Sequence, residues 1–405
     1  MTDNTYFIDL LATGTTTITV DDDGIGSDWL VFSGVYAAPT DIRLSWYADA
    51  GVSTQASGSY FNPGNIGHRL VVNGLIENVR GSNGADFIQG NEQNNILYGD
   101  NLSSGPGGAD SIFGFDGNDT IYGGAGEDSI GGANGDDLLF GDDGADTISG
   151  GEGRDTVIGG AGADVLSGGG DAHDLVSYSG STLGVTIAIT YGTATTGHGG
   201  HAEGDSITGF ADVAGSSRGD VIYDTVKGTI AFGYNDNVFY GGFGNDKLYL
   251  GGGNDTGHGG NDADLILGEQ GNDLLMGEQG TDTLRGGVGA DVLFGGTEAD
   301  TFQFTSHLES TVAAAGRDSI RDFSTAEGDH IDLSLIDAKT HTAGNDAFTF
   351  IGDAAFVAGV DGQLRAVAYG GGWLVTGDLN GDRIADFGIY VVSPTALTAG
   401  DFILY

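Results

Sequence analysis

Aspartate recurs at intervals of nine residues through much of this chain, and carboxylates at a fixed spacing can bind a cation. In the stretch from Gly105 to Ile112, as in most of its repeats, the aspartate comes five residues after a glycine and two before an aliphatic residue. Calcium takes about six to eight oxygen ligands from carboxylates and backbone carbonyls, whereas magnesium demands a tighter octahedron. The pattern therefore favours calcium. The candidate ligands in the repeats are Asp86, Asp110, Asp119, Asp128, Asp137, Asp146, Asp155, Asp164, Asp246, Asp255, Asp264, Asp273, Asp282, Asp291 and Asp300.

The elements that must position these carboxylates follow from the repeat unit G-G-x-G-x-D-x-U-x, where U is aliphatic. This unit resembles the calcium-binding RTX nonapeptide. We expect positions 7 to 9 to form a short strand with position 8 pointing inward, while the glycines permit the positive φ angles of a tight turn. Two nonapeptides make one coil, so aspartates 18 residues apart should stack. One predicted stack contains Asp110, Asp128, Asp146 and Asp164, and the other contains Asp119, Asp137 and Asp155.

Stacked carboxylates oppose closure of such a coil. Adjacent strands lie about 4.8 Å apart, and two charges at that distance repel by about 3 kcal/mol at an effective dielectric near 20. A bound cation is therefore expected to be required. The repeat is irregular at four places, where we expect calcium sites to be missing or distorted. Gly257 at an inward position should leave a hole, and Asn95 replaces a ligand aspartate. His173 displaces Asp174 by one residue, and residues 224–240 keep only fragments of the period.

Composition restricts the class of protein. The 405 residues include 78 glycines and carry 58 acidic against 13 basic side chains, a net charge of −45. Such a charge repels nucleic acid and anionic membranes and attracts cations. The chain has no cysteine and so cannot form the disulfides that stabilise many extracellular domains. Bound metal is therefore expected to stabilise the fold if the protein is extracellular. No apolar run reaches the length of a membrane span, and no cleavable signal peptide is apparent. Regularly spaced apolar residues argue against a flexible Gly-rich linker.

These patterns predict an all-β fold, a parallel β-roll made of two repeat arrays between β-rich N- and C-terminal caps, with little helix. A repeat stack needs caps because its end coils would otherwise expose apolar edges. The predicted parts are a cap at 1–80, a first roll at 81–176, a connecting insertion at 177–214, a second roll at 215–300, and a C-terminal cap with the secretion region at 301–405.

Beyond the repeat, the chain resembles the C-terminal region of serralysin-type secreted metalloproteases. Residues 23–34 are similar to that family's D-x-G-G-N-D-T-L-D-F-S-G segment, residues 76–82 to I-E-N-A-x-G-G, residues 316–323 to G-R-D-x-I-x-D-F and residues 330–334 to K-I-D-L-S. The resemblance implies a calcium site at Asp23 and Asp28, although Val31 replaces a family aspartate. The resemblance also implies a capped β-roll. Residues 401–405 of the chain, an acidic residue followed by apolar ones, resemble the C-terminal signal of substrates of type I secretion.

The family's protease chemistry is not expected here. None of the eight histidines lies in H-E-x-x-H, the motif that places two zinc ligands and a glutamate base on one helix, and the part before Asp23 is too short for a catalytic domain. Two other groups of polar residues each allow two interpretations. His198 and His201, with Glu203 and Asp205, form either a transition-metal site or an exposed loop. Residues 378–386 read D-x-N-x-D-x-x-x-D, which fits either a calcium loop lacking the glycine and glutamate of an EF-hand or a polar turn.

Taken together, the sequence predicts a secreted, non-enzymatic protein that folds on calcium outside the cell. It is expected to act as a structural or adhesive component of the cell surface or matrix, with no catalytic residues and no cofactor other than multiple calcium ions. Its expected partners are a type I exporter and either a cell-surface polysaccharide or another protein. The alternatives are an extracellular polysaccharide-acting enzyme with an unrecognised site, and an accessory module for a separate partner protein.

Overall fold

A computed structural model describes residues 5–9, 29–33, 68–71, 78–81, 84–100, 107–169, 173–190, 192–225 and 236–405. For residues 5–9, 29–33, 68–71 and 78 the description covers the backbone alone. The predicted calcium ligands Asp23 and Asp28 lie outside the described residues.

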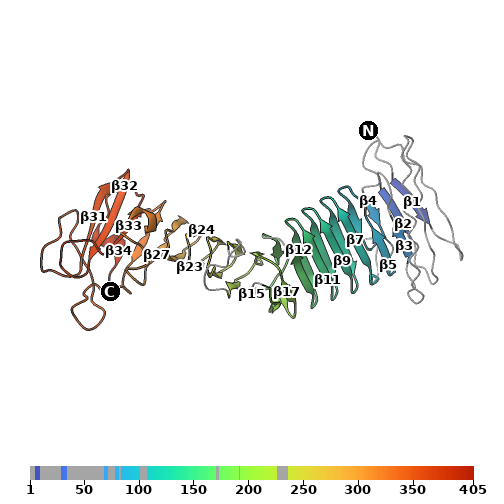
Figure 1. The fold of residues 1–405 in the computed structure, drawn as a ribbon, viewed down its shortest axis with the longest axis horizontal. Coiled ribbons are helices and arrows are strands. Elements are labelled where there is room, and N and C mark those ends of the chain that lie inside the picture. The colour runs from blue at the N-terminus through green and yellow to red at the C-terminus, as the bar shows by residue number, and fades with distance from the viewer. Residues whose placement is uncertain are drawn as a thin grey trace. The chain divides into compact units, whose positions relative to one another are not determined.

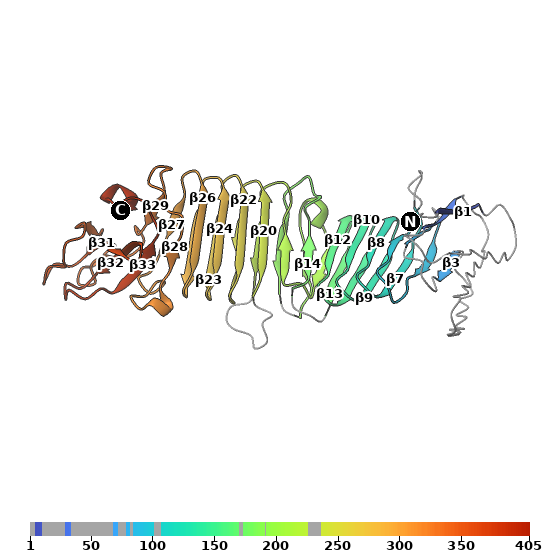
Figure 2. The same ribbon diagram turned by 90° about the horizontal axis from the view of Figure 1, so that it is seen from above.

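The chain divides into two compact units, one of residues 1–178 with 192–210 and the other of residues 179–191 with 211–405. Each unit consists of two ladders of parallel strands that alternate along the chain, so that successive strands of one ladder are mostly 18 residues apart. This arrangement confirms the predicted all-β parallel roll, and Figures 1 and 2 show the strands of each unit stacked side by side. The part boundaries predicted from sequence stay predictions.

In the first unit, the two ladders begin within residues 1–80, whose described strands pair in parallel with those of the roll. One ladder contains β1 (Thr5–Asp9), β2 (Trp29–Ser33), β4 (Asn78–Arg80), β6 (Ile96–Tyr98), β8 (Thr120–Ala125), β10 (Leu138–Asp143), β12 (Thr156–Ala161) and β14 (Leu175–Ser177). The other contains β3 (His68–Val71), β5 (Asp86–Gln89), β7 (Ser111–Asp116), β9 (Ser129–Asn134), β11 (Thr147–Glu152), β13 (Val165–Gly169), β17 (Ser206–Thr208) and the antiparallel β16 (Thr195–Thr196).

The second unit repeats this plan. One ladder contains β18 (Asp212–Ala214), β20 (Val238–Phe243), β22 (Thr256–Asn261), β24 (Leu274–Gln279), β26 (Val292–Thr297) and β28 (Ser319–Ile320). The other contains β15 (Thr186–Ile189), β19 (Val221–Asp224), β21 (Lys247–Tyr249), β23 (Leu265–Gln270), β25 (Thr283–Val288), β27 (Thr301–Gln303), β29 (His330–Asp332) and β34 (Phe402–Ile403).

An antiparallel sheet closes the second unit. It comprises β31 (Gln363–Tyr369), β32 (Gly372–Asp378) and β33 (Phe387–Val391), with β30 (Thr349–Phe350) paired to β31. Strand β33 pairs with β28, and β34 pairs with β29, so each ladder ends on a strand of the C-terminal segment. This covers the strand edges that an open stack would expose. Figures 1 and 2 show β31 to β33 grouped at this end of the unit.

Helix is scarce, as predicted. In the described part of the chain it is limited to three 3-10 turns, η1 (Gly200–Ala202), η2 (Ala314–Gly316) and η3 (Ala399–Asp401). None of the described helical turns is long and apolar enough to cross a membrane.

The repeat strands are longer than predicted. They run through positions 7 to 9 and on into positions 1 to 3 of the next unit, as in β8 (Thr120–Ala125). Residues two apart in a strand lie on the same face, so the position-8 side chain and the next position-1 glycine both face inward, as Ile121 and Gly123 do. The strand can therefore continue past position 9 without turning its apolar face outward. The position-8 side chains form the core of each unit and are at most 3% exposed: Ile112, Ile121, Ile130, Leu139, Ile148, Val157 and Leu166 in the first, and Leu248, Ile266, Leu275, Leu284, Leu293 and Phe302 in the second.

The hole predicted at Gly257 is wrong. Leu250, which replaces the usual position-1 glycine, is fully buried and fills that space. A Cβ at Gly257 would lie 2.8 Å from Ile266 Cγ2 and 3.2 Å from Leu250 Cδ1. The two departures from the repeat therefore compensate each other, because an extra side chain at one inward position takes the volume missing at the next.

Candidate metal centres

The predicted aspartate stacks are present in the first unit and are held by a hydrogen bond that sequence reasoning did not foresee. The backbone N–H of each ladder aspartate donates to Oδ1 of the aspartate one coil further on. In one stack these bonds run from Asp86 to Asp110 (2.7 Å), Asp110 to Asp128 (2.8 Å), Asp128 to Asp146 (2.9 Å) and Asp146 to Asp164 (2.9 Å). In the other they run from Asp119 to Asp137 (2.7 Å) and Asp137 to Asp155 (2.9 Å).

The second unit contains the same arrangement. One stack joins Asp246 to Asp264 (2.8 Å), Asp264 to Asp282 (2.8 Å) and Asp282 to Asp300 (2.9 Å). The other joins Asp255 to Asp273 (2.9 Å) and Asp273 to Asp291 (2.9 Å). The fixed direction of these bonds follows from the parallel register, since every coil presents the same groups to the next.

The second oxygen of these carboxylates has a different environment. In most of these aspartates Oδ2 is buried and receives no hydrogen bond, and these residues are at most 3% exposed. A buried polar atom without a partner is rare in folded proteins, and such an atom is a candidate ligand for a bound water or ion. The residues with such an Oδ2 are Asp110, Asp119, Asp128, Asp137, Asp146, Asp164, Asp246, Asp255, Asp264, Asp273, Asp282, Asp291, Asp300 and Asp318.

The position-1 glycines form a cradle around this oxygen. A Cβ on Gly123 would lie 2.5 Å from Asp128 Oδ2 and 2.8 Å from the Gly141 carbonyl oxygen. A Cβ on Gly141 would lie 2.4 Å both from Asp146 Oδ2 and from the next glycine carbonyl. Glycine is therefore needed here for close approach, and it brings a carboxylate oxygen and a carbonyl oxygen, both hydrogen-bond acceptors, around one backbone site.

Electrostatics favour a cation at these oxygens. Burial, together with repulsion from Asp164 and Asp128, raises the pKa of Asp146 to about 7. Burial likewise raises the pKa of Asp246 to about 8 and that of Asp110 to about 9. Such displacements mean that the charged carboxylates are destabilised where they lie. A cation that binds them reverses this effect.

The residues fit calcium better than a transition metal. A cation in a stack would be held by aspartate Oδ2 atoms together with glycine carbonyls, the all-oxygen mixture that calcium accepts. Calcium bound there would supply the positive charge that these carboxylates lack.

Further rungs of the stacks lie outside the regular repeats and were not predicted as ligands. Hydrogen bonds of the same type join these rungs to the predicted ligands: from Asp155 to Asp174 (2.9 Å), Asp164 to Asp205 (2.9 Å), Asp220 to Asp246 (2.7 Å), Asn237 to Asp255 (2.7 Å), Asp291 to Asp318 (3.0 Å) and Asp300 to Asp329 (3.0 Å). The additional rungs are Asp174, Asp205, Asp220, Asn237, Asp318 and Asp329. Most are followed two residues later by an aliphatic side chain, as in Asp205-Ser206-Ile207. That triplet, without the glycines, is the signal that could have identified them.

Two of the predicted irregularities keep their place in the stack. Asn95 donates its backbone N–H to Asp119 Oδ1 at 2.7 Å, so it occupies the rung of the missing aspartate. Asp174 takes the rung that the period assigns to His173, and His173 has a φ of +78°. The one-residue shift is absorbed by the backbone at that turn.

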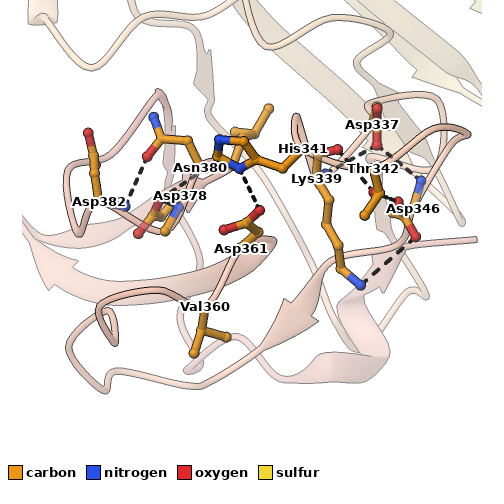
Figure 3. Close-up of polar contacts among 12 residues, drawn as sticks. Asp337, Lys339, His341, Thr342, Asp346, Val360, Asp361, Asp378, Asn380 and Asp382 are labelled. Atoms are coloured by element: carbon orange, nitrogen blue, oxygen red, sulfur yellow. Dashed lines mark hydrogen bonds and ion pairs between the residues drawn. The ribbon is translucent and has the colours of Figure 1, made fainter.

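The D-x-N-x-D loop of the C-terminal segment uses its acidic side chains to fix a turn (Figure 3). Asp378 is fully buried and accepts hydrogen bonds from the backbone N–H groups of Gly381 (2.7 Å) and Arg383 (2.9 Å). Asn380 Oδ1 accepts from the backbone N–H of Asp382 (2.9 Å). Near this loop, His341 Nδ1 lies 2.8 Å from Asp361 Oδ2. These bonds favour the polar-turn interpretation of residues 378–386.

The histidine-rich segment is also arranged as a local turn. His201 lies in η1 (Gly200–Ala202), and Glu203 Oε2 accepts the backbone N–H of Gly199 at 2.9 Å. Asp205, the fourth member of that group, belongs to the aspartate stack. This arrangement favours the loop interpretation.

Comparison with known proteins agrees with this geometry. The family model described as the RTX calcium-binding nonapeptide repeat matches residues 73–101, 104–139, 140–172, 233–266 and 267–302. The chain therefore carries RTX calcium-binding repeats. A solution structure of the AlgE6R3 subunit from the Azotobacter vinelandii mannuronan C5-epimerase is similar at 27% identity, over 37% of this chain and 77% of that one, with a TM-score of 0.27. A search of curated proteins found no significant match.

Proposed function

We propose that this RTX repeat protein is secreted, is not an enzyme, and folds on calcium outside the cell to form a structural or adhesive component of the cell surface or matrix. The observation that supports this proposal most is the row of buried Oδ2 atoms without hydrogen-bond donors along the stacks. When they are ionised, so many unpartnered buried carboxylates need bound cations for the fold to be stable, because an unpaired buried charge is strongly destabilising.

Calcium then acts as the folding ligand. Where a metal site forms only in the folded chain, its binding free energy becomes folding free energy. Extracellular calcium sites bind at about 10⁻⁴–10⁻³ M, so weak sites of this kind would stay empty in the cytosol and load outside the cell. The net charge of −45 keeps an unloaded chain extended and dispersed.

Export through a type I exporter fits this cycle. The C-terminal residues that resemble an export signal are folded into the second unit: β34 (Phe402–Ile403) pairs with β29 (His330–Asp332), and the Phe402 ring lies 5.1 Å from that of Phe350. A segment paired in a sheet is accessible to a receptor only before folding. A chain that folds after export would therefore carry its signal exposed through the channel and bury it afterwards.

Circular dichroism with and without a chelator tests the calcium step. We expect β structure in millimolar calcium and its loss in chelator, because the stacked carboxylates repel once the cation leaves. An unchanged β spectrum in chelator would contradict the proposal. A screen for cleavage and binding of polysaccharides and peptides in calcium, and measurement of cell-surface retention after a chelator wash, would separate an enzyme from an adhesive component.

A further inference from the structure

Two of the aspartate stacks end in a different way from their interiors. In the interior, Oδ1 accepts a backbone N–H and Oδ2 has no donor. At three rungs outside the matched nonapeptides, the protein itself supplies donors to both carboxylate oxygens. These rungs are Asp205, Asp220 and Asp329.

Asp205 ends one stack of the first unit. Its Oδ1 accepts the backbone N–H of Asp164 at 2.9 Å, as in an ordinary rung. Its Oδ2 accepts the hydroxyl of Tyr178 at 3.0 Å. The Tyr178 side chain is 2% exposed, so a buried hydroxyl stands beside the oxygen that has no donor in the interior rungs.

Asp220 and Asp329 lie at the two ends of one stack in the second unit. Asp220 Oδ2 accepts the backbone N–H of Ser216 at 2.6 Å, and its Oδ1 accepts the Ser216 hydroxyl at 2.8 Å and the backbone N–H of Val185 at 2.6 Å. Asp329 Oδ2 accepts the backbone N–H of Ser324 at 2.7 Å. Between them, the Oδ2 atoms of the interior rungs of this stack have no donor.

We propose that Tyr178, Ser216 and Ser324 are stack terminators, which supply neutral hydrogen-bond donors at the position that a calcium ion takes in the interior and so set where calcium loading stops. This inference rests on the proposed calcium function and specifies its extent. A donor hydrogen directed at Oδ2 occupies one of the lone pairs of that oxygen and places a positive dipole beside it, which opposes a cation there. A terminal rung of this kind is satisfied without metal, which gives the stacks that end at Asp205, Asp220 and Asp329 a metal-independent end.

Asp318 provides the contrasting case. It also lies outside the matched nonapeptides and ends a stack, because Asp291 donates its backbone N–H to Asp318 Oδ1 at 3.0 Å. However, Asp318 is fully buried and its Oδ2 has no donor. This stack is therefore expected to load calcium as far as Asp318.

The matched pair Asp205→Asn and Asp318→Asn tests the inference, with calcium counted by native mass spectrometry at saturating calcium. Both changes remove one charge and keep an Oδ1 acceptor for the preceding N–H. We expect Asp205→Asn to bind as many calcium ions as the wild type, and Asp318→Asn to bind at least one fewer. Tyr178→Phe, which removes the terminating hydroxyl, should bind one more than the wild type, and Tyr122→Phe should bind the same number.

Equal losses in Asp205→Asn and Asp318→Asn would overturn the terminator role, as would a full count in Asp318→Asn. If Tyr178→Phe does not fold, the asparagine pair still decides the question. Asp146→Asn, in the interior of a stack, separates this outcome from failure of the proposed function. If the wild type binds no calcium, or Asp146→Asn keeps every ion, the calcium function itself is refuted, whereas loss in Asp146→Asn with equal losses in the asparagine pair refutes the terminators alone.

Discussion

Replacing one interior carboxylate should change stability in opposite directions with and without calcium. Asp146 is 1% exposed, its Oδ1 accepts the backbone N–H of Asp128 at 2.9 Å, and its Oδ2 has no donor. Asp146→Asn keeps the Oδ1 acceptor and removes the charge. In calcium the change takes away a charged ligand, and in chelator it takes away a buried charge that nothing compensates.

The magnitudes follow from the pKa of Asp146, which burial raises from 3.8 to about 7. A group whose pKa is raised in the folded state binds protons more tightly there, so the metal-free fold is destabilised as the pH rises from 3.8 through 7. At about 1.36 kcal/mol per pH unit of displacement, the charge costs at most roughly 4 kcal/mol at pH 8 and nothing below the unfolded pKa. Breaking a buried charge pair by removing one partner costs about 3–5 kcal/mol, which sets the expected loss in calcium.

Circular dichroism measures both effects. In millimolar calcium, denaturant unfolding should show Asp146→Asn less stable than the wild type by about 3–5 kcal/mol. In chelator, acidification should restore β structure, and the variant should regain it at a higher pH than the wild type. The control is Asp143→Asn, which makes the same charge change at an exposed position. Destabilisation of Asp146→Asn in both conditions, or identical acid transitions for the two variants, would refute the reasoning.

Four further predictions address the cradle, the core, the pH dependence and the C-terminal segment. Gly141→Ala places a Cβ 2.4 Å from Asp146 Oδ2, and should lower the calcium affinity of the roll in titrations, whereas Gly180→Ala, with nothing within 4 Å, should not. Leu250→Gly should destabilise the calcium-loaded second unit by about 2–5 kcal/mol through a cavity, and adding Gly257→Leu should recover part of this loss in thermal unfolding. Calcium affinity measured by titration calorimetry should fall between pH 8 and pH 6, because protons compete for stacked aspartates whose pKa values burial raises to between about 6 and 9; equal affinities would contradict the ligand assignment. Deleting residues 301–405 should prevent export by cells with a type I exporter, and normal secretion of that truncation would rule out a C-terminal signal.

The spacing of residues was sufficient to predict the roll and most of its rungs. A period of nine with an inward aliphatic position requires parallel coils of two units, so Asp128 and Asp146, 18 residues apart, must become neighbours in one stack. The direction of every stacking hydrogen bond then follows from the repeat, because identical coils in parallel register present identical groups. These features depend only on the repeated order of residues along the chain, so they can be predicted from the sequence.

Contacts between segments that do not follow the period were decided only by the tertiary structure. Nothing in the sequence indicates that the Tyr178 hydroxyl meets Asp205, 27 residues on, or that Ser216 and Val185 both donate to Asp220. The filling of the space at Gly257 by Leu250 likewise depends on which side chain the fold brings there. Spacing determines which residues stack, but whether an oxygen in the stack meets a donor or needs a cation depends on atoms that only folding brings within hydrogen-bond distance.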